Sequence, residues 1–127
     1  MAFSALMVDD SPTMRSFIRR VLDMSGFDVG SSIEACDGLD ALEKISTQWV
    51  DLVLTDIMPG MNGEQLLRRM AEDELMKEIP VVVVSTDSTA VRIETMAALG
   101  AKVYVTKPFH PEQLRQELER VMEMANV

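Results

Sequence analysis

Five polar side chains of types that suit phosphoryl chemistry occur at the ends of short apolar runs in this sequence. They are three acids, a hydroxyl and an amine, namely Asp9, Asp10, Asp56, Ser85 and Lys107. Three carboxylates gathered within about 5 Å would repel one another by roughly 3 kcal/mol per pair at an effective dielectric constant near 20, so they need a proton or a cation to coexist. Oxygen ligands without a partnering His or Cys favour Mg²⁺, which keeps water ligands and shares its sites with phosphate oxygens. We therefore expect a Mg²⁺ site and disfavour zinc.

A carboxylate held beside Mg²⁺ can act as a nucleophile toward a phosphoryl group and form an acyl phosphate. The ammonium group of Lys107 can screen the equatorial phosphoryl oxygens together with the metal. Ser85 can donate a hydrogen bond to the same group, and its movement toward the phosphoryl group would be a natural first step of a switch. A single Asp after a strand is usually a turn or cap residue, so the combination of residues carries the prediction.

The elements that must position these residues follow from hydrophobic periodicity. Short apolar runs, several of them with apolar residues at every position, predict strands that are buried on both faces of a sheet. The five predicted strands are 3–8, 27–35, 51–56, 81–84 and 102–105.

Helices are predicted between these strands from apolar residues that recur three and four positions apart. The first has Ser11 as a cap, Pro12 at its first position and Gly26 as its stop. Its apolar side is formed by Met14, Phe17, Ile18, Val21 and Leu22. The other predicted helices are 38–45, with Leu39, Leu42 and Ile45 as its apolar positions, then 64–71, 90–99 and one that runs from Pro111 to the chain end.

Five strands that alternate with five helices predict an α/β fold, a doubly wound parallel sheet covered by helices on both faces. In such a sheet, ligands bind beyond the carboxyl ends of the strands. The five polar residues above stand at or beside those ends, so we expect them to converge.

Length and composition restrict the classes of protein that need to be considered. The 127 residues suit one domain. We predict that residues 1–127 form this domain and that no output domain is present, so the protein would act by binding a partner. One cysteine cannot form an intramolecular disulfide, and neither a secretory signal nor a run of about 20 apolar residues is found, so we expect a cytoplasmic protein. The net charge of −9 disfavours direct binding to nucleic acid or to an anionic membrane. Most of the eleven methionines are expected to fill the core.

Residues 9–15, Asp-Asp-Ser-Pro-Thr-Met-Arg, resemble the acidic pair and first helix of CheY-like response-regulator receiver domains of the chemotaxis type. The resemblance extends over the whole chain. It implies the strand order 2-1-3-4-5 that these receivers share with flavodoxins, Asp56 as the phosphoacceptor, and Mg²⁺ held by Asp9, Asp10 and Asp56.

The same resemblance implies roles for residues near the ends of the last two strands. Ser85 and Thr86 match the family's hydroxyl residue and its small neighbour, and Lys107-Pro108-Phe109 matches its Lys-Pro motif, with a cis peptide bond before the proline. Tyr104 matches the switch aromatic, whose rotamer reports phosphorylation to partners at the surface of the fourth helix, fifth strand and fifth helix.

A response regulator in a two-component system is therefore the leading hypothesis, with a place in chemotaxis as its extension. A histidine kinase or a phosphotransfer protein would supply the phosphoryl group, and a partner protein would read the result. The chain would not be an enzyme beyond self-phosphorylation from a phosphodonor and autodephosphorylation.

Three other hypotheses fit parts of the sequence. A receiver fold could act as a phosphorylation-independent interaction module, although the retained acids, hydroxyl and amine argue against it. A flavin carrier of the flavodoxin type would need a phosphate-binding loop of Ser, Thr and Gly where Asp9 and Asp10 would repel the flavin phosphate. A haloacid-type phosphatase would need a second acid two positions after its nucleophile, which the run Asp9-Asp10-Ser11 lacks.

The sequence departs from the family pattern directly after the expected acceptor. Receivers typically read Asp-x-x-Met-Pro-x-Met-x-Gly, whereas residues 56–63 read Asp-Ile-Met-Pro-Gly-Met-Asn-Gly and are one residue shorter. The missing residue removes up to about 3.5 Å of chain reach. It falls beside the position that in the family offers a backbone carbonyl to the metal, so we assign neither Ile57 nor Met58 as a metal ligand. Either the strand end or the start of the third helix shifts to restore a carbonyl, or water replaces it, and we expect the second because Mg²⁺ accepts additional water ligands.

Inserting one residue after Ile57 should therefore strengthen Mg²⁺ binding and speed phosphorylation. The measurement is a Mg²⁺ titration that follows the amide NMR shifts of Asp10 and Asp56 in both proteins. An insertion variant with equal or weaker Mg²⁺ affinity would show that the short loop is no handicap.

Overall fold

The computed structural model describes residues 3–24, 29–56, 63–85, 89–107 and 109–125. Its strands are β1 Phe3–Val8, β2 Val29–Ala35, β3 Leu52–Thr55, β4 Val81–Ser85 and β5 Val103–Thr106. Its helices are α1 Pro12–Met24, α2 Gly38–Thr47, α3 Gly63–Glu72, the short 3₁₀ helix η1 Met76–Glu78, α4 Ala90–Ala98 and α5 Pro111–Ala125. The strands pair in parallel in the order β2-β1-β3-β4-β5, which confirms the predicted fold class.

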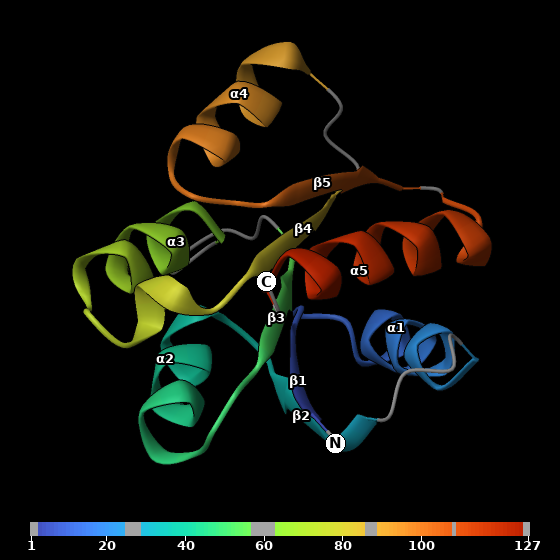
Figure 1. Cartoon of the computed structure of the whole chain (residues 1–127), viewed down its shortest axis with the longest axis horizontal. Coiled ribbons are helices and arrows are strands. Elements are labelled where there is room, and N and C mark those ends of the chain that lie inside the picture. Colours follow the sequence, from blue (N-terminus) through green and yellow to red (C-terminus); the bar gives the residue numbers. More distant parts are fainter. Residues whose placement is uncertain (1–2, 25–28, 57–62, 86–88, 108, 126–127) are drawn as a thin grey trace.

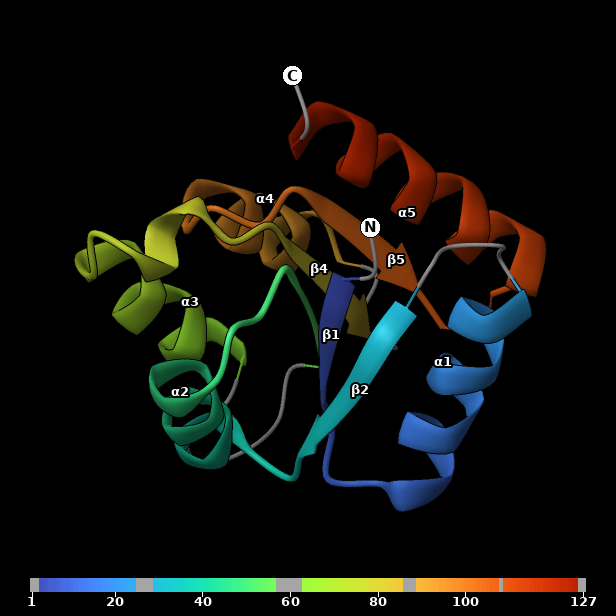
Figure 2. The ribbon, with the colours of Figure 1, turned by 60° about the horizontal axis from the view of Figure 1, so that its bottom comes forward.

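Helices cover both faces of the sheet, with α1 and α5 on one side and α2, α3 and α4 on the other (Figures 1 and 2). Alternate residues of β1 enter two separate hydrophobic clusters: Ala5 and Met7 pack with α1 and α5, whereas Leu6 and Val8 pack with the other three helices. Because successive side chains of a strand point to opposite faces, a strand in the middle of the sheet is buried at every position and is mostly apolar. All four residues of β3 and all five of β4 are buried accordingly.

Side-chain caps and one glycine define several helix ends. Ser11 Oγ accepts from the backbone N–H of Met14 at 3.2 Å, which confirms its predicted capping role at α1. Asp37 and Thr89 cap α2 and α4 in the same way. Beyond α4, Gly100 has φ 111°, a left-handed conformation that glycine adopts without strain, so this glycine ends the helix as predicted.

Three features of the fold differ from the sequence-based expectation. Leu39 was expected on the apolar side of α2, but its side chain is 61% exposed. The other two predicted positions are confirmed, because Ile45 is buried beside Gly38 and Ala41, and Leu42 packs partly buried against the core. The 3₁₀ helix η1 was not predicted, because a single turn leaves no periodic pattern. Strand and helix ends shift by one or two residues, and the predicted start of the second strand and the stop at Gly26 lie outside the described residues.

None of the described helices combines the length and the apolar character that a membrane span requires.

Leu54 provides a test of the packing around β3, because its side chain is fully buried between β3 and the helices α1 and α5. Leu54→Ala should lower the free energy of unfolding by about 3 kcal/mol, from lost burial and the remaining cavity. Leu39→Ala is the matched control, since the same change at an exposed position should stay within about 0.5 kcal/mol. Urea denaturation measures both, and equal losses would contradict the described packing.

Candidate functional site

Four of the predicted site residues lie at one edge of the sheet. Asp9 and Asp56 directly follow β1 and β3, Ser85 ends β4 and Lys107 follows β5. Backbone hydrogen bonds continue the strand ladders to these positions: Asp56 N–H donates to the Val8 carbonyl at 3.0 Å, and Lys107 N–H donates to the Ser85 carbonyl at 2.7 Å. The carboxyl ends of neighbouring parallel strands therefore bring together residues up to 98 positions apart.

Lys107 lies between the two carboxylates. Its Nζ is 3.4 Å from Asp9 Oδ2 and 3.2 Å from Asp56 Oδ2. The three side chains differ in exposure, with Asp9 at 3%, Lys107 at 12% and Asp56 at 20%. One ammonium group thus offsets the repulsion between two acids, and Asp56 is the acid of this pair that solvent reaches more easily.

The buried carboxylate of Asp9 is held by the start of the first helix as well as by Lys107. Its Oδ1 accepts from the backbone N–H of Ser11 at 2.8 Å. Burial away from water raises the pKa of Asp9, and the nearby Asp56 charge acts in the same direction, while the Ser11 hydrogen bond and Lys107 oppose the rise without cancelling it. Asp9 therefore ionises at a cost that a further cation would relieve.

The third predicted acid, Asp10, is exposed at the start of the turn into α1. Within the described residues, no three side chains of His, Cys, Asp or Glu form a group that could hold a metal ion. The donors present nevertheless have the right chemistry for Mg²⁺, because Asp9 and Asp56 offer carboxylate oxygens at one edge and Asp10 is the next residue in the chain. A bound cation would compete with Lys107 for the same oxygens.

Several residues of the predicted site lie outside the part of the chain that the structure describes. Thr86, Pro108 and the whole of 57–62 lie outside the described residues, so the shortened loop and the peptide bond before Pro108 stay predictions. Ser85 is described and is 3% exposed, at the end of β4 and next to β5 in the sheet.

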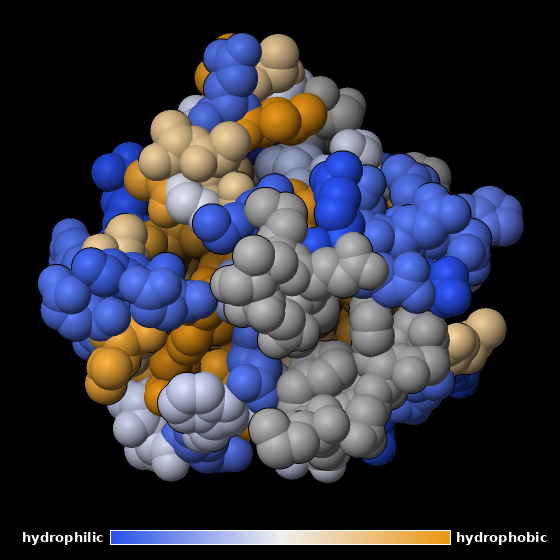
Figure 3. Space-filling model, viewed as in Figure 1, coloured by the Kyte–Doolittle hydropathy of each residue, from blue (hydrophilic) through white to orange (hydrophobic). Residues whose placement is uncertain are grey.

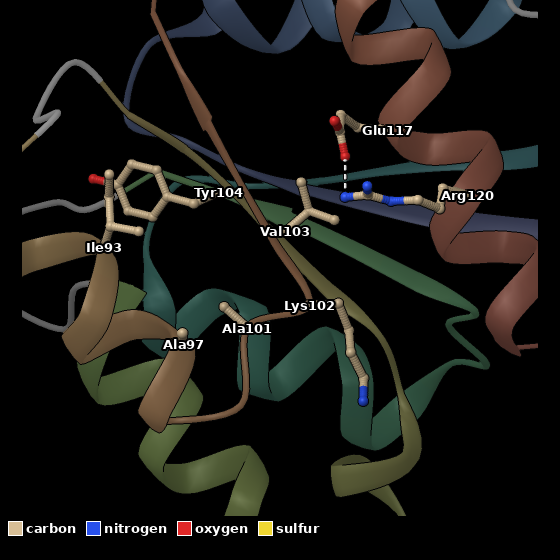
Figure 4. Close-up of a pocket in the computed structure, with 8 residues that line it drawn as sticks. All are labelled: Ile93, Ala97, Ala101, Lys102, Val103, Tyr104, Glu117 and Arg120. Atoms are coloured by element: carbon tan, nitrogen blue, oxygen red, sulfur yellow. Dashed lines mark hydrogen bonds and ion pairs between the residues drawn. The ribbon is translucent and has the colours of Figure 1, made fainter. Parts of the chain in front are cut away.

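Tyr104 lies in β5 and lines a depression of about 300 Å³ between α4 and α5 (Figure 4). Its ring lies beside Ile93 of α4, and Arg120 and Glu117 of α5 form an ion pair of 2.6 Å on the other side of the strand. Tyr104 also pairs in register with Val83 of β4, two residues before Ser85. The predicted switch aromatic is thus two strand positions away from the site edge and borders a surface hollow.

Arg15 of α1, to which the sequence assigned no role, holds the backbone at Asp9 in place. Its guanidinium donates to the backbone carbonyl of Asp9 and pairs with Glu34 of β2 at 2.9 Å. Arg15 thereby joins the ends of β1 and β2. An Arg one turn into a helix is an ordinary surface residue in sequence, and only the pairing of β1 with β2 reveals its partner.

Comparisons with known proteins agree with this geometry. The family described as "Response regulator receiver domain" matches residues 5–119. The chain is 38% identical over 122 residues to the chemotaxis protein CheY of Pseudomonas aeruginosa, covering 95% of this chain and 97% of that protein. It is 35% identical to CheY1 of Helicobacter pylori strain 26695, over 92% of this chain and 94% of that one. Among solved structures, CheY4 of Vibrio cholerae matches with a TM-score of 0.85 at 29% identity, over 95% and 99% of the two chains.

The chain belongs to the response regulator receiver domain family. It is a CheY-like receiver domain of a two-component system and not an enzyme that turns over a separate substrate. Receivers of this family are typically Mg²⁺-dependent, take their phosphoryl group from a histidine kinase and act on a downstream partner.

The raised pKa of Asp9 gives a prediction for stability in metal-free buffer. Because the pKa of Asp9 in the folded state lies above its ordinary value of 3.8, the folded state binds more protons between these two pKa values, and stability falls as the pH rises through that range. Asp9→Asn has no carboxyl group to ionise, so its free energy of unfolding should not fall in this way. Its stability should equal that of the natural chain below this pH range and should exceed it above the range. Urea denaturation with a chelator at several pH values measures it, and a natural chain that is the more stable at neutral pH would refute it.

Proposed function

We propose that the chain accepts a phosphoryl group on Asp56 from a histidine kinase or a phosphotransfer protein, with Mg²⁺ as cofactor, and thereby changes its affinity for a partner protein. The observation that carries the proposal is the position of Lys107 Nζ, within 3.4 Å of Asp9 and 3.2 Å of Asp56. An ammonium group at that point lies where the charge of a phosphoryl group on Asp56 would develop.

Exposure and hydrogen bonding favour Asp56 over Asp9 as the nucleophile. Asp9 is almost fully buried, and one of its oxygens is engaged by the N–H of Ser11. Asp56 follows the central strand β3 and keeps a fifth of its side-chain surface open to solvent. An incoming phosphodonor can reach an Asp56 oxygen without opening the fold.

The transfer exchanges one bond to phosphorus for another. An Asp56 carboxylate oxygen forms a P–O bond as the P–N bond to the donor's imidazole breaks, and the imidazole leaves with the bonding electron pair. Mg²⁺, when bound through Asp10 and Asp56 with help from Asp9, would neutralise part of the phosphoryl charge. Lys107 would move its contact from the Asp56 carboxylate to the phosphoryl oxygens, and Ser85 would donate its hydroxyl to them.

The link from the site to the partner surface passes through β4 and β5. Ser85 and Thr106 are paired in register, as are Val83 and Tyr104, so a shift of Ser85 toward a phosphoryl group acts on the strand that carries Tyr104. Tyr104 borders the hollow between α4 and α5 (Figure 4). We propose the α4, β5 and α5 surface as the place where the partner distinguishes the two states.

A phosphorylation-independent interaction module is the second candidate. The shortened segment after Asp56 favours it, because that segment carries the family's carbonyl ligand for the metal. The paired acids and the lysine between them oppose it, because a purely structural role gives no reason to keep two like charges together at the cost of burying one of them.

We also propose a signalling pathway, a cellular location and a kind of partner for this protein. The chemotaxis relatives suggest that this protein also works in chemotaxis, as a cytoplasmic protein whose residues 1–127 form one receiver domain. Its net charge of −9 makes another protein, and not nucleic acid, the expected partner.

Asp56→Asn tests the acceptor directly. A carboxamide keeps the size of the side chain but cannot form the acyl phosphate, so exposure to acetyl phosphate with Mg²⁺ should add one phosphoryl group to the natural chain and none to the variant. Intact mass measures the gain. The matched control is Asp51→Asn, an acid at the opposite end of the same strand, which should still be labelled. Labelling of Asp56→Asn at the natural level would contradict the assignment, and an unlabelled natural chain would favour the interaction module.

A further inference from the structure

A second hollow of about 640 Å³ lies at the opposite end of the sheet from the phosphorylation site. It is formed where α2 leads into β3 and where α3 and η1 lead into β4, so its residues precede the strands whose ends carry Asp56 and Ser85. The four residues of β3 separate the two sites by about 13 Å along the strand. Figure 3 shows hydrophobic side chains exposed in this hollow, left of the centre, between α2 and the segment from α3 to η1.

The floor of this hollow, here called the α2–η1 groove, is part of the hydrophobic core. Ile45 and Val50 are buried members of the cluster beneath it, and Met76 and Ile79 are partly buried against that cluster. Two large apolar side chains stand at its rim instead of being buried: Trp49 is 79% exposed and Leu75 is 84% exposed. An apolar floor with exposed aromatic and aliphatic groups beside it has the composition of a protein-binding surface.

Hydrogen bonds hold both rim residues in place. Asp51 accepts from Trp49 Nε1 at 2.6 Å and from the backbone N–H of Ser4 at 2.8 Å, which ties the indole to the start of β1. Asp73 accepts from the N–H groups of Leu75 and Met76 at 2.9 and 3.0 Å, which fixes the turn into η1. The indole of Trp49 and the backbone at Leu75 are thus held before binding, which lowers the entropy that association would cost.

The charge around the groove selects the kind of ligand. Among the described residues that line it, four are acidic and none is basic. Glu74 and Glu78 are exposed, and the adjacent Lys77 is paired with Glu74 at 2.9 Å. A second copy of this chain would bring its own net charge of −9 to the same acidic rim and be repelled. An apolar side with basic residues beside it is the complementary ligand.

We propose that the α2–η1 groove binds a basic amphipathic helix of a partner protein, with apolar side chains inserted between Trp49 and Leu75 and with Lys or Arg residues facing the acidic rim. The groove lies away from both the phosphorylation site and the α4, β5 and α5 surface. A partner bound there leaves both of those surfaces accessible and can keep the receiver close to its phosphodonor or its target.

The test uses three synthetic peptides of about four helical turns, each made of two residue types. The first contains Leu and Lys with the leucines on one helical side, the second has the same composition with the leucines spread around the helix, and the third replaces every Lys of the first by Glu. Calorimetry gives affinities, and Trp49, the one tryptophan of the chain, reports occupation of the groove through a blue shift of its emission.

The first peptide should bind with one-to-one stoichiometry and shift the Trp49 emission, the second should bind at least about tenfold more weakly, and the third should not bind. Leu75→Ser should weaken the first peptide about tenfold, the effect of leaving one leucine side chain unburied. Leu39→Ser is the matched control, since it removes an exposed leucine from the other end of α2 without changing the charge, and it should bind as the natural chain does.

Equal affinity for the first two peptides, or equal binding by the natural chain and Leu75→Ser, would mean that only net charge attracts these peptides, and the proposal would be wrong. Absence of binding by the first peptide would overturn it as well. A concentration-dependent dimer that Leu75→Ser dissociates would show that the groove accepts a second copy instead.

Discussion

The contact of one lysine with two carboxylates is the interaction on which the functional end of this protein depends. Asp9 and Asp56 leave neighbouring parallel strands at the same edge, and their charges repel. Lys107 Nζ lies within 3.4 Å of both and offsets that repulsion. Burial away from water nevertheless raises the pKa of Asp9, so its charged form still carries a desolvation cost. A cation such as Mg²⁺ would relieve that cost, and a phosphoryl group on Asp56 would add negative charge that attracts the ammonium group of Lys107.

The rest of the fold holds that arrangement in place. β1, β3 and β4 are buried on both faces, so they cannot slide without moving two hydrophobic clusters at once. Ser11, which caps α1, and Arg15 of α1 fix the turn after β1 by hydrogen bonds to the Asp9 carboxylate and the Asp9 carbonyl. Rigid strands can also transmit small displacements, and the β4–β5 pairing places Ser85 opposite Thr106, two residues after Tyr104.

Different ends and sides of one small sheet can thus serve different partners. The carboxyl ends hold the charged site, and the β5 edge carries the hollow with Tyr104. The amino ends of β3 and β4 carry the α2–η1 groove, whose exposed Trp49 and Leu75 serve no packing role in the isolated chain. Exposed apolar groups of that size reduce solubility, so a binding role accounts for them better than core packing does.

Much of the fold could be predicted from the sequence because the information is local. Runs such as Val81–Ser85 contain enough apolar residues to define a strand buried on both faces, and Ser11, Pro12 and Gly100 mark helix ends through their own backbone preferences. The convergence of Asp9, Asp56, Ser85 and Lys107 could be predicted because each stands within two residues of the end of a predicted strand, and parallel strands end at one edge of the sheet. The boundaries shifted by a residue or two, since the final turn of a helix depends on what it packs against.

Only the tertiary structure decided which of these residues meet and how deeply each is buried. Asp9 and Asp10 are adjacent acids in the sequence, yet one is buried against Lys107 and the other is exposed. Leu39 follows the apolar pattern of its helix but lies at the solvent-facing side. Strand pairing and helix packing join distant parts of the chain. They bring Arg15 into an ion pair with Glu34 and place Trp49 and Leu75 beside one groove. Periodicity specifies which side of an element is apolar, whereas the partner that covers that side is chosen by packing over the whole domain.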